Sequence, residues 1–493
     1  MAAAGPVLCL RVEDIPVLGL DAWAAACAAA LDAGERMLTL YGRPADPGLL
    51  MLTAVLQDTT GRMRPIRCAA AQGAAYPALT ARFPAVQMFE RELWEQTGVE
   101  PVGHPWCKPV RYEGARQQQM HAHPFFVLRG QQVHEVGVGP IHAGVIEPGH
   151  FRFMCHGEQV LHLEIQLGYQ HRGVEALLLQ RPPHMLTPLV ETIVGDSSIA
   201  HAWSCCNALE ALGGVQVSAG AEKLRGIALE LERIAMHLAA LTGLATDIAF
   251  LQGGATLGRL RTAIINATLR ICGSRFGRGW LRPGGVRFGI PEVLRRDLQQ
   301  TLRGFAQDAA QVHALMLDAR SVQARFQGVG VVGTQVAQDL GLVGLVARAS
   351  GLAMDARTSQ PGRLYAASPF AVLTQATGDC WARMQLRMRE IDASTQWIQL
   401  LLQDPADDLA APSAPAPVRL APQSLCVSVQ EGFRGPVVQV LETAADGRLL
   451  HYKVQDPSLL NWFGLAWAVR NNDISDFPIC NKSFDLSYCG NDL

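Results

Sequence analysis

The sequence predicts an α+β protein, in which a small α/β N-terminal domain precedes a larger, mainly helical domain with peripheral β-hairpins. Within residues 1–125, short apolar runs typical of strands alternate with alanine-rich helical segments. From about residue 136, a hairpin pattern gives way to long helical periodicity that extends to about residue 403. Strand patterns return only near the C-terminus. We therefore expect two domains, residues 1–125 and 126–493.

In the N-terminal domain, the apolar runs "MLTLYG" (37–42) and "LLMLTAVLQD" (49–58) predict strands. The run "FERELWEQTG" (89–98) predicts a helix that ends at a glycine. In the second domain, "HFRFMCHGEQVLHLEIQLGY" (150–169) predicts a hairpin around a His-Gly-Glu turn. Near the C-terminus, "VVQVLETAADGRLLHYKVQ" (437–455) predicts two strands joined at Asp446-Gly447, and a helix follows.

The segment 221–251 predicts a long amphipathic helix. Its apolar residues recur at spacings of three and four and form one stripe: Leu224, Ile227, Leu231, Ile234, Leu238 and Leu241. Glu230, Arg233 and His237 lie off that stripe but near one another on the helix. We favour an exposed ion pair beside a helical histidine; a functional cluster is the alternative.

Composition indicates a well-packed globular chain without a charged macromolecular partner. Apolar residues make up 49% and charged residues 17% of the 493 residues, and the net charge is −2. This balance argues against nucleic acid as a partner. Neither a basic leader followed by an apolar core nor an uncharged apolar run of membrane-spanning length stands out. A cytoplasmic location is therefore expected.

The sequence motifs predict no redox cofactor held by this chain itself. None of its 12 cysteines forms a Cys-x-x-Cys pair, the spacing that zinc, iron–sulfur and nickel–iron sites commonly use. No Gly-x-Gly-x-x-Gly motif follows a strand, so we expect no NAD site.

Six segments in a fixed order resemble one superfamily: residues 139–153, 167–178, 229–241, 281–286 ("LRPGGV"), 431–435 ("EGFRG") and 452–465. They are similar to the large subunit of group 4, formate hydrogenlyase-type [NiFe] hydrogenases and to the homologous 49 kDa quinone-site subunit of respiratory complex I. The first 125 residues resemble the complex I 30 kDa subunit, fused here to the large subunit. Their marker is "FERELWEQTGVEPVGHP" (89–105).

The resemblance implies that the nickel–iron centre is missing. In the hydrogenases, two Cys-x-x-Cys pairs supply four thiolates, which suit these soft metals. Here Val194 and Ser197 stand at the first pair and Ser487 and Gly490 at the second, so all four ligands are absent. The chain ends eight residues after Asp485, and we expect no maturation cleavage.

The quinone site of the complex I subunit is matched only in part. Ile193 stands where the family has its quinone-contacting tyrosine, and Gly277 where it has a histidine near the terminal cluster. His142 and His150 are both candidates for the headgroup histidine. Asp247, ten residues after His237, matches the family's site aspartate. A histidine–carboxylate pair of this kind could exchange protons near neutral pH.

Further polar residues carry over from the family motifs. The resemblance places His171 and Arg172 beside the cluster of a partner subunit and Glu147 on a proton path. It makes Arg434 the active-site arginine, and Asp355 with Arg357 the family's Asp-x-Arg. For each of these residues the alternative is a packing or capping role.

Two functions follow as hypotheses. In the first, the chain is a subunit of a membrane-associated, complex I-like oxidoreductase at the cytoplasmic face of the membrane. A small subunit with a [4Fe-4S] cluster and antiporter-like and anchor subunits would be its partners, and a quinone, bound without a covalent link, is a candidate acceptor. In the second, the chain is a non-catalytic scaffold for the iron–sulfur subunit. An open polar cavity at the former metal position would favour the first, and a filled one the second.

Overall fold

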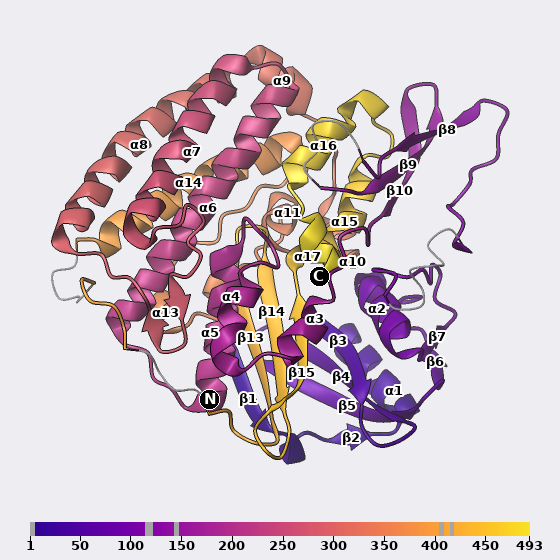
Figure 1. The fold of residues 1–493 in the computed structure, drawn as a ribbon. Helices are drawn as coiled ribbons and strands as arrows, with labels where there is room; N and C mark the ends of the chain where they lie inside the picture. Colours follow the sequence, from indigo (N-terminus) through magenta and orange to yellow (C-terminus); the bar gives the residue numbers. More distant parts are fainter. Residues whose placement is uncertain (1–4, 114–121, 142–146, 404–408, 415–418) are drawn as a thin grey trace.

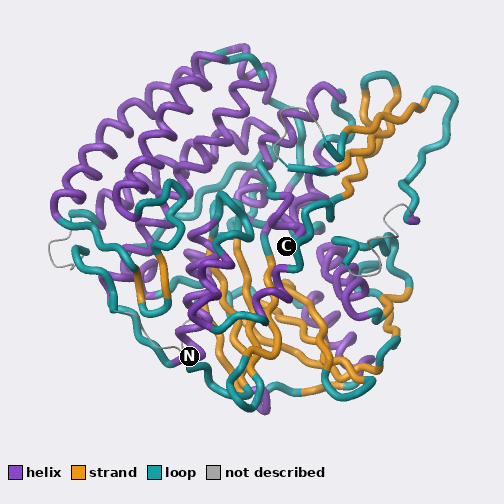
Figure 2. Tube along the Cα trace, viewed as in Figure 1, coloured by secondary structure: helices purple, strands orange, loops and turns teal. Residues whose placement is uncertain are grey.

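The computed structural model describes residues 5–113, 122–141, 147–403, 409–414 and 419–493. Helices and strands are both abundant, and a bundle of long helices stands beside two packed sheets (Figures 1 and 2). The predicted α+β class is confirmed.

The N-terminal sheet has the strand order β2-β5-β4-β3. It contains β2 (Val17–Leu18), β3 (Arg36–Pro44), β4 (Leu49–Gln57) and β5 (Met63–Ala71), with α1 (Leu20–Asp32) and α2 (Gln87–Thr97) packed against it. Because side chains alternate along a strand, Leu52 and Leu56 of β4 face these helices whereas Val55 faces the opposite side. A short parallel pair, β6 (Ala75–Pro77) and β7 (Glu100–Val102), lies alongside.

The second sheet combines the first strand of the chain with the last three. Its antiparallel order is β1 (Val7–Arg11), β13 (Ser424–Glu431), β14 (Pro436–Thr443) and β15 (Leu449–Gln455). Every residue of β13 and β14 is buried, because the N-terminal sheet covers one face and α5 (Ser198–Gly213) covers the other. The division at residue 125 stays a prediction. β1 lies before this point in the chain, yet it pairs with β13, more than 400 residues away.

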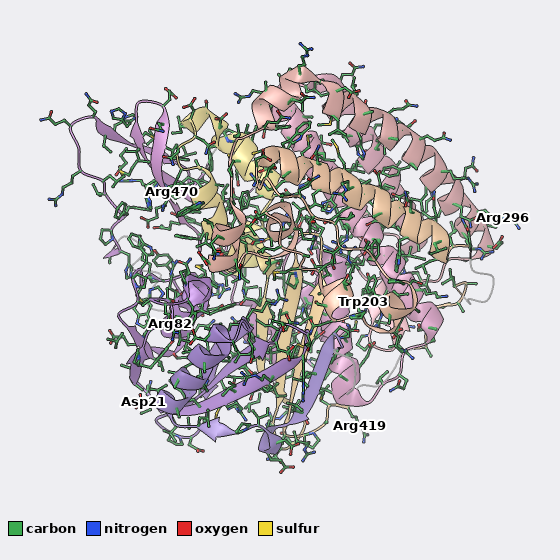
Figure 3. The ribbon with its side chains drawn as sticks, turned by 180° about the vertical axis from the view of Figure 1, so that it is seen from behind. Asp21, Arg82, Trp203, Arg296, Arg419 and Arg470 are labelled. Carbon is green, nitrogen blue, oxygen red and sulfur yellow. The ribbon has the colours of Figure 1, made fainter. Side chains whose placement is uncertain are left out.

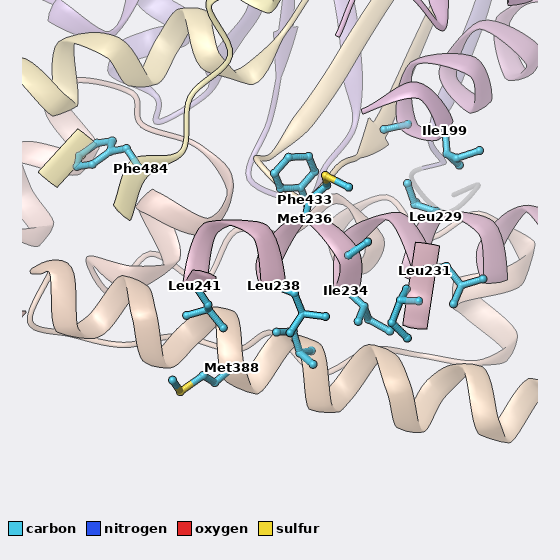
Figure 4. Packing of buried hydrophobic residues seen from close by; sticks show 14 of the residues in the cluster. Ile199, Leu229, Leu231, Ile234, Met236, Leu238, Leu241, Met388, Phe433 and Phe484 are labelled. Atoms are coloured by element: carbon cyan, nitrogen blue, oxygen red, sulfur yellow. The ribbon is translucent and has the colours of Figure 1, made fainter. Parts of the chain in front are cut away.

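Four long helices form the bundle in Figure 1: α6 (Ala219–Asp247), α7 (Leu251–Cys272), α8 (Glu292–Asp318) and α14 (Cys380–Leu401). The Ser218 side chain caps α6 by accepting a hydrogen bond from the Ala221 N–H. The predicted stripe is confirmed, since all six of its residues are buried. Figure 4 shows Leu238 and Leu241 directed toward Met388 of α14, and Met236 near Phe433 on the opposite side.

The exposed ion pair favoured for Glu230, Arg233 and His237 is wrong. All three side chains are 0% exposed. Apolar periodicity reports only the face of α6 that packs on hydrophobic neighbours. The other face is also covered, by charged and polar groups from α14 and from the end of β13.

A three-stranded sheet extends from the body of the molecule at the upper right of Figure 1. It consists of β8 (Val133–Val138), β9 (His150–His156) and β10 (Gln159–Gln166), and it confirms the hairpin predicted for residues 150–169. The C-terminal helices α15 (Pro457–Ala468), α16 (Phe477–Phe484) and α17 (Tyr488–Asp492) lie between this sheet and the bundle.

Short elements connect these parts. They are α3 (Val174–Leu179), α4 (Leu186–Val190), β11 (Leu281–Arg282), β12 (Gly285–Val286), α9 (Arg320–Phe326), α10 (Thr334–Asp339), α11 (Gly344–Ala349), α12 (Ala356–Ser359), α13 (Arg363–Ala367) and the 3₁₀ turns Val12–Asp14, Pro84–Val86, Pro183–Met185 and Ile474–Asp476. Seen from behind, Trp203 of α5 lies in the interior while Arg82 and Arg296 lie at the surface (Figure 3). Among the described residues, no helix combines the length and apolarity needed to cross a bilayer.

Candidate functional site

Two of the residues that the resemblance places at metal-ligand positions, Val194 and Gly490, meet in the structure although they are far apart in the sequence. Val194 lies in the turn before α5, and Gly490 lies in α17. A Cβ atom built on Gly490 would be 2.9 Å from Cγ2 of Val194. Ser487 caps α17, because its Oγ accepts a hydrogen bond from the Gly490 N–H at 2.9 Å. Ser197 Oγ lies 3.6 Å from the Cβ position of Gly432, the residue two before Arg434.

Neighbouring side chains crowd the Gly490 position. All four residues are buried, and a Cβ on Gly490 would come within 2.6 Å of the Asp456 carboxylate. Asp456 is fixed there by His201 (Nε2–Oδ2 3.1 Å) and by the Ser458 N–H (2.8 Å). Burial alone would raise the pKa of Asp456, but these two partners outweigh it and lower the pKa. No group of three metal-ligating side chains is present in the described ranges.

Arg434 and Asp196 form a two-pronged ion pair near these positions. The guanidinium Nη1 and Nη2 atoms lie 2.7 and 2.9 Å from the two carboxylate oxygens. The Arg434 Nε–H donates to the Asp485 carbonyl, and the guanidinium stacks over the Phe433 ring at 4.3 Å. The Arg434 side chain is 7% exposed and that of Asp196 is 38% exposed. The pair therefore holds the guanidinium in a fixed orientation at the border between core and solvent.

Glu147 lies beside α17. Its Oε2 accepts a hydrogen bond from the Cys489 N–H at 2.8 Å, and its Oε1 lies 3.7 Å from the Cys489 thiol. Burial raises the pKa of Glu147 above its ordinary value, although Cys489 and Arg434 both act in the opposite direction. The structure thus brings a protonatable carboxyl group into the electrostatic field of the Arg434 cation.

His171 and Arg172 are tied to the same region through backbone carbonyls. Arg172 donates to the carbonyls of Thr192 and Ile193, both at 2.9 Å, immediately before Val194. The His171 ring Nδ1 lies 2.8 Å from the Asp492 carbonyl. Arg172 is exposed and His171 is half-buried, so both lie at a surface next to the site.

Asp355, Arg357 and His237 belong to a second group, which we call the buried charge cluster: Glu230, Arg233, His237, Arg348, Asp355, Arg357, Arg387, Glu390 and Glu431. Arg357 pairs with Asp355 at 2.7 Å and with Glu230 at 3.2 Å. Arg348 pairs with Glu390 at 2.8 Å and with Glu431 at 2.9 Å. Asp355 also caps α12 through the Arg357 N–H.

His237 stays neutral within this cluster. Arg387 Nη1 donates to its Nδ1 at 3.0 Å, which leaves the Nε2–H to donate to Glu390 at 2.8 Å. Burial lowers the pKa of His237 to about 4. Its carboxylate partner is Glu390, whereas the sequence motif had suggested Asp247.

The buried charge cluster supports the loop that carries Arg434. Arg233 donates to the carbonyls of Glu431 (2.8 Å) and Gly432 (3.0 Å). The Phe433 ring is edge-on to His237, with centroids 6.0 Å apart, and its face supports Arg434. Residues 431–434 therefore connect the buried charge cluster to the Arg434–Asp196 ion pair.

The remaining candidates lie elsewhere or outside the described residues. Asp247 lies partly exposed at the end of α6; the partial burial of its carboxyl raises its pKa, and the Lys482 charge acts in the opposite direction. His150 begins β9, with Nδ1 3.2 Å from the Gly139 carbonyl and its ring 5.2 Å from that of Phe125. His142 lies outside the described residues. The structure does not bring Asp247 or His150 into contact with Arg434.

Sequence reasoning missed several partners that the structure supplies. Asp196 binds Arg434, and Arg348, Arg387 and Glu390 organise the buried charge cluster. Only the position of Asp196 directly before Ser197 could have drawn attention to it. The other three occur in ordinary helical sequence and give no comparable signal.

Comparisons with known proteins agree with this architecture. Residues 247–419 match the family model described as the 49 kDa subunit of respiratory-chain NADH dehydrogenase. The carbon monoxide-induced hydrogenase of Rhodospirillum rubrum is 30% identical over 71% of this chain and 96% of its own length. The chain belongs to the family of hydrogenase large subunits and complex I 49 kDa subunits.

Other members of this family span even more of the chain. Formate hydrogenlyase subunit 5 of Escherichia coli is 28% identical over 84% of this chain and 76% of its own length. NADH-quinone oxidoreductase subunit 4 of Thermus thermophilus is 30% identical over 72% of this chain and 92% of its own length. A chain in the structure of the membrane-bound sulfane sulfur reductase, an archaeal respiratory membrane complex, shares the fold with a TM-score of 0.69. The match covers 74% of this chain and 99% of that chain, at 22% sequence identity.

Proposed function

We propose that this chain is a subunit of a membrane-associated, complex I-like oxidoreductase that works without a nickel–iron centre. Electrons from a [4Fe-4S] cluster in a small partner subunit reach an acceptor beside Arg434, and their arrival is coupled to proton or ion movement. A quinone is the first candidate for the acceptor. Assembly into a membrane-associated complex is supported by the relatives, which are subunits of membrane-bound hydrogenase and complex I-type assemblies.

The observation that carries the proposal is that Glu147, a carboxyl group with a raised pKa, lies within the electrostatic influence of the fixed Arg434 guanidinium. A fixed guanidinium stabilises negative charge on a reduced acceptor, and a carboxyl group with a raised pKa can deliver the accompanying proton. Asp196 binds both Nη atoms of Arg434 and so fixes the orientation of the guanidinium. Together these groups supply the charge and the proton that a proton-coupled reduction requires.

The partner surfaces follow from the same arrangement. His171 and Arg172 lie at the surface beside the site, and in this proposal the iron–sulfur subunit docks there. Antiporter-like and anchor subunits hold the assembly at the cytoplasmic face of the membrane, so that this chain is attached peripherally.

One observation favours a non-catalytic scaffold as the second candidate. Val194, Ser197, Ser487 and Gly490 are buried, and Asp456 occupies the space next to Gly490. A scaffold has no need of an open cavity at this position. In that case the chain only holds the iron–sulfur subunit on a complex whose redox chemistry takes place elsewhere.

The test uses the intact complex, purified through this subunit, with Glu147→Gln and Arg434→Lys variants. Glu100→Gln, which changes an exposed carboxylate at the first residue of β7, is the matched control. We expect unchanged subunit composition and a loss of electron transfer to a soluble quinone analogue of roughly 100-fold for Glu147→Gln. Full turnover by correctly assembled Glu147→Gln and Arg434→Lys complexes would favour the scaffold.

A further inference from the structure

Two cysteines face each other across the strands at opposite ends of the chain. In the β1–β13 pairing, Cys9 is directly opposite Cys426. On either side of them, the Val429 N–H donates to the Pro6 carbonyl and the Val12 N–H donates to the Gln423 carbonyl, both at 2.8 Å. Hydrogen-bonded and non-hydrogen-bonded pairs alternate along an antiparallel ladder, which places the two cysteines at a non-hydrogen-bonded pair.

This position suits a disulfide. The Cα atoms of a non-hydrogen-bonded pair are about 4.5 Å apart, inside the range of about 4.4–6.8 Å that disulfides span. The Cβ atoms of directly opposed residues lie about 4.5–5.5 Å apart, slightly farther than a relaxed disulfide prefers. A bond here would carry some strain and would therefore be easily reduced.

The two thiols differ in access. Cys9 is exposed on the edge strand, whereas Cys426 is fully buried in a core cluster with Leu441 and Tyr452. The thiols hydrogen-bond to each other, and this bond lowers the pKa of Cys9 to about 7 while raising that of Cys426. Cys9 thus has the properties of an attacking thiolate and Cys426 those of a resolving thiol.

We propose that Cys9 and Cys426 form a reversible redox site whose substrates are small disulfides. The Cys9 thiolate attacks one sulfur of the small disulfide, breaks its S–S bond and releases one thiolate. The Cys426 thiol then gives its proton to that thiolate, attacks the Cys9 sulfur and expels the second thiolate, which takes a proton from water. Two protein thiols are oxidised to one disulfide, and the small disulfide is reduced to two thiols.

The Cys9–Cys426 disulfide connects β1, the N-terminal strand, to β13, the strand that leads into the candidate site. β1 is the edge strand of its sheet, and β13 ends at Glu431, directly before the loop that carries Arg434. In the oxidised protein, β1 can no longer separate from β13 without breaking a covalent bond. Amide exchange in residues 7–11 should therefore slow on oxidation. This inference does not depend on the proposed function.

A second cysteine pair provides an internal control. Cys380 and Cys480 also hydrogen-bond to each other, but both are fully buried in the core between α14 and α16. Gly330 covers them so closely that a Cβ there would be 2.7 Å from the Cys480 sulfur. A small disulfide in solution has no access to this pair in the folded chain.

The experiment treats the full chain with glutathione disulfide, blocks free thiols and maps the peptides without reduction. We expect a linked Cys9–Cys426 peptide that dithiothreitol removes, with Cys380 and Cys480 alkylated only after unfolding. Cys9→Ser should abolish the linkage, and Cys426→Ala should leave Cys9 as a stable mixed disulfide with glutathione. A wild-type chain in which Cys9 stays a mixed disulfide or unmodified, or in which only Cys380 and Cys480 become linked, would overturn the proposal.

Discussion

Two regions of the molecule differ in the charge they hold. At Val194, Ser197, Ser487 and Gly490 the side chains are small and neutral, whereas the buried charge cluster keeps arginines and carboxylates in full contact. Without a metal, neutral side chains can replace thiolates and leave no charge unpaired. Removing one member of a buried ion network leaves its partners buried without a counter-charge, which lowers the free energy of unfolding by about 3–5 kcal/mol. The buried charge cluster is therefore the region in which single substitutions should cost the most stability.

The largest expected effect is on the buried charge cluster. Arg348→Met leaves Glu390 and Glu431 without their main cation, and we expect a loss of about 3–5 kcal/mol in the free energy of unfolding. Denaturant unfolding of the purified chain measures it. Arg259→Met, which breaks an exposed pair with Asp308, is the control and should leave the midpoint unchanged. Equal effects from the two variants would show that burial of the Arg348 network adds nothing to the cost of breaking an ion pair.

The next effect concerns Glu232, which joins α6 to the start of α5. Its carboxyl accepts hydrogen bonds from the Ile199 and Ala200 N–H groups, and burial raises its pKa from 4.5 to about 8. The folded state thus holds a proton that the unfolded state releases. The resulting stability is present below about pH 4.5 and is lost as the pH rises through about 8.

The measurement compares wild type with Glu232→Gln between pH 5 and 8. Because one proton is involved, the wild-type free energy of unfolding should fall by up to about 1.4 kcal/mol per pH unit relative to the variant. Parallel pH profiles for the two proteins would show that Glu232 is already ionised in the folded state.

A smaller effect tests whether the former ligand position is filled. Gly490→Ala places a methyl group within 2.6 Å of Asp456 and 2.9 Å of Val194, so we expect destabilisation of about 1–3 kcal/mol. Gly304→Ala, in α8 with nothing within 4 Å, should instead stabilise by about 0.5–1 kcal/mol. A neutral or stabilising Gly490→Ala change would mean that space remains open there.

The smallest effect is expected at Asp247. Its carboxylate is exposed at the end of α6, so Asp247→Asn should change the free energy of unfolding by no more than about 0.5 kcal/mol. Thermal unfolding checks this value. A much larger loss would place Asp247 within the supporting network and join it to the Arg434 region.

The sequence predicts the elements with strong local patterns. The stripe on α6, the β9–β10 hairpin and the strands around Asp446-Gly447 all follow from short-range periodicity and turn chemistry. The meeting of Val194 with Gly490 could be anticipated only from family motifs, because nearly 300 residues separate the two positions.

What the sequence did not predict depends on long-range pairing of charges. His237 binds Glu390 from a helix about 150 residues away, and neither residue carries a local signal for the other. For the same reason Glu230 and Arg233 were expected at the surface: an amphipathic pattern cannot reveal that the polar face of a helix is covered by oppositely charged groups.

The most direct test of the central claim is the nickel and iron content of the intact complex purified through this subunit. The account predicts iron from the partner cluster and no stoichiometric nickel, because Val194, Ser197, Ser487 and Gly490 offer no thiolate. One nickel per complex would contradict this prediction and would make hydrogen turnover the leading function.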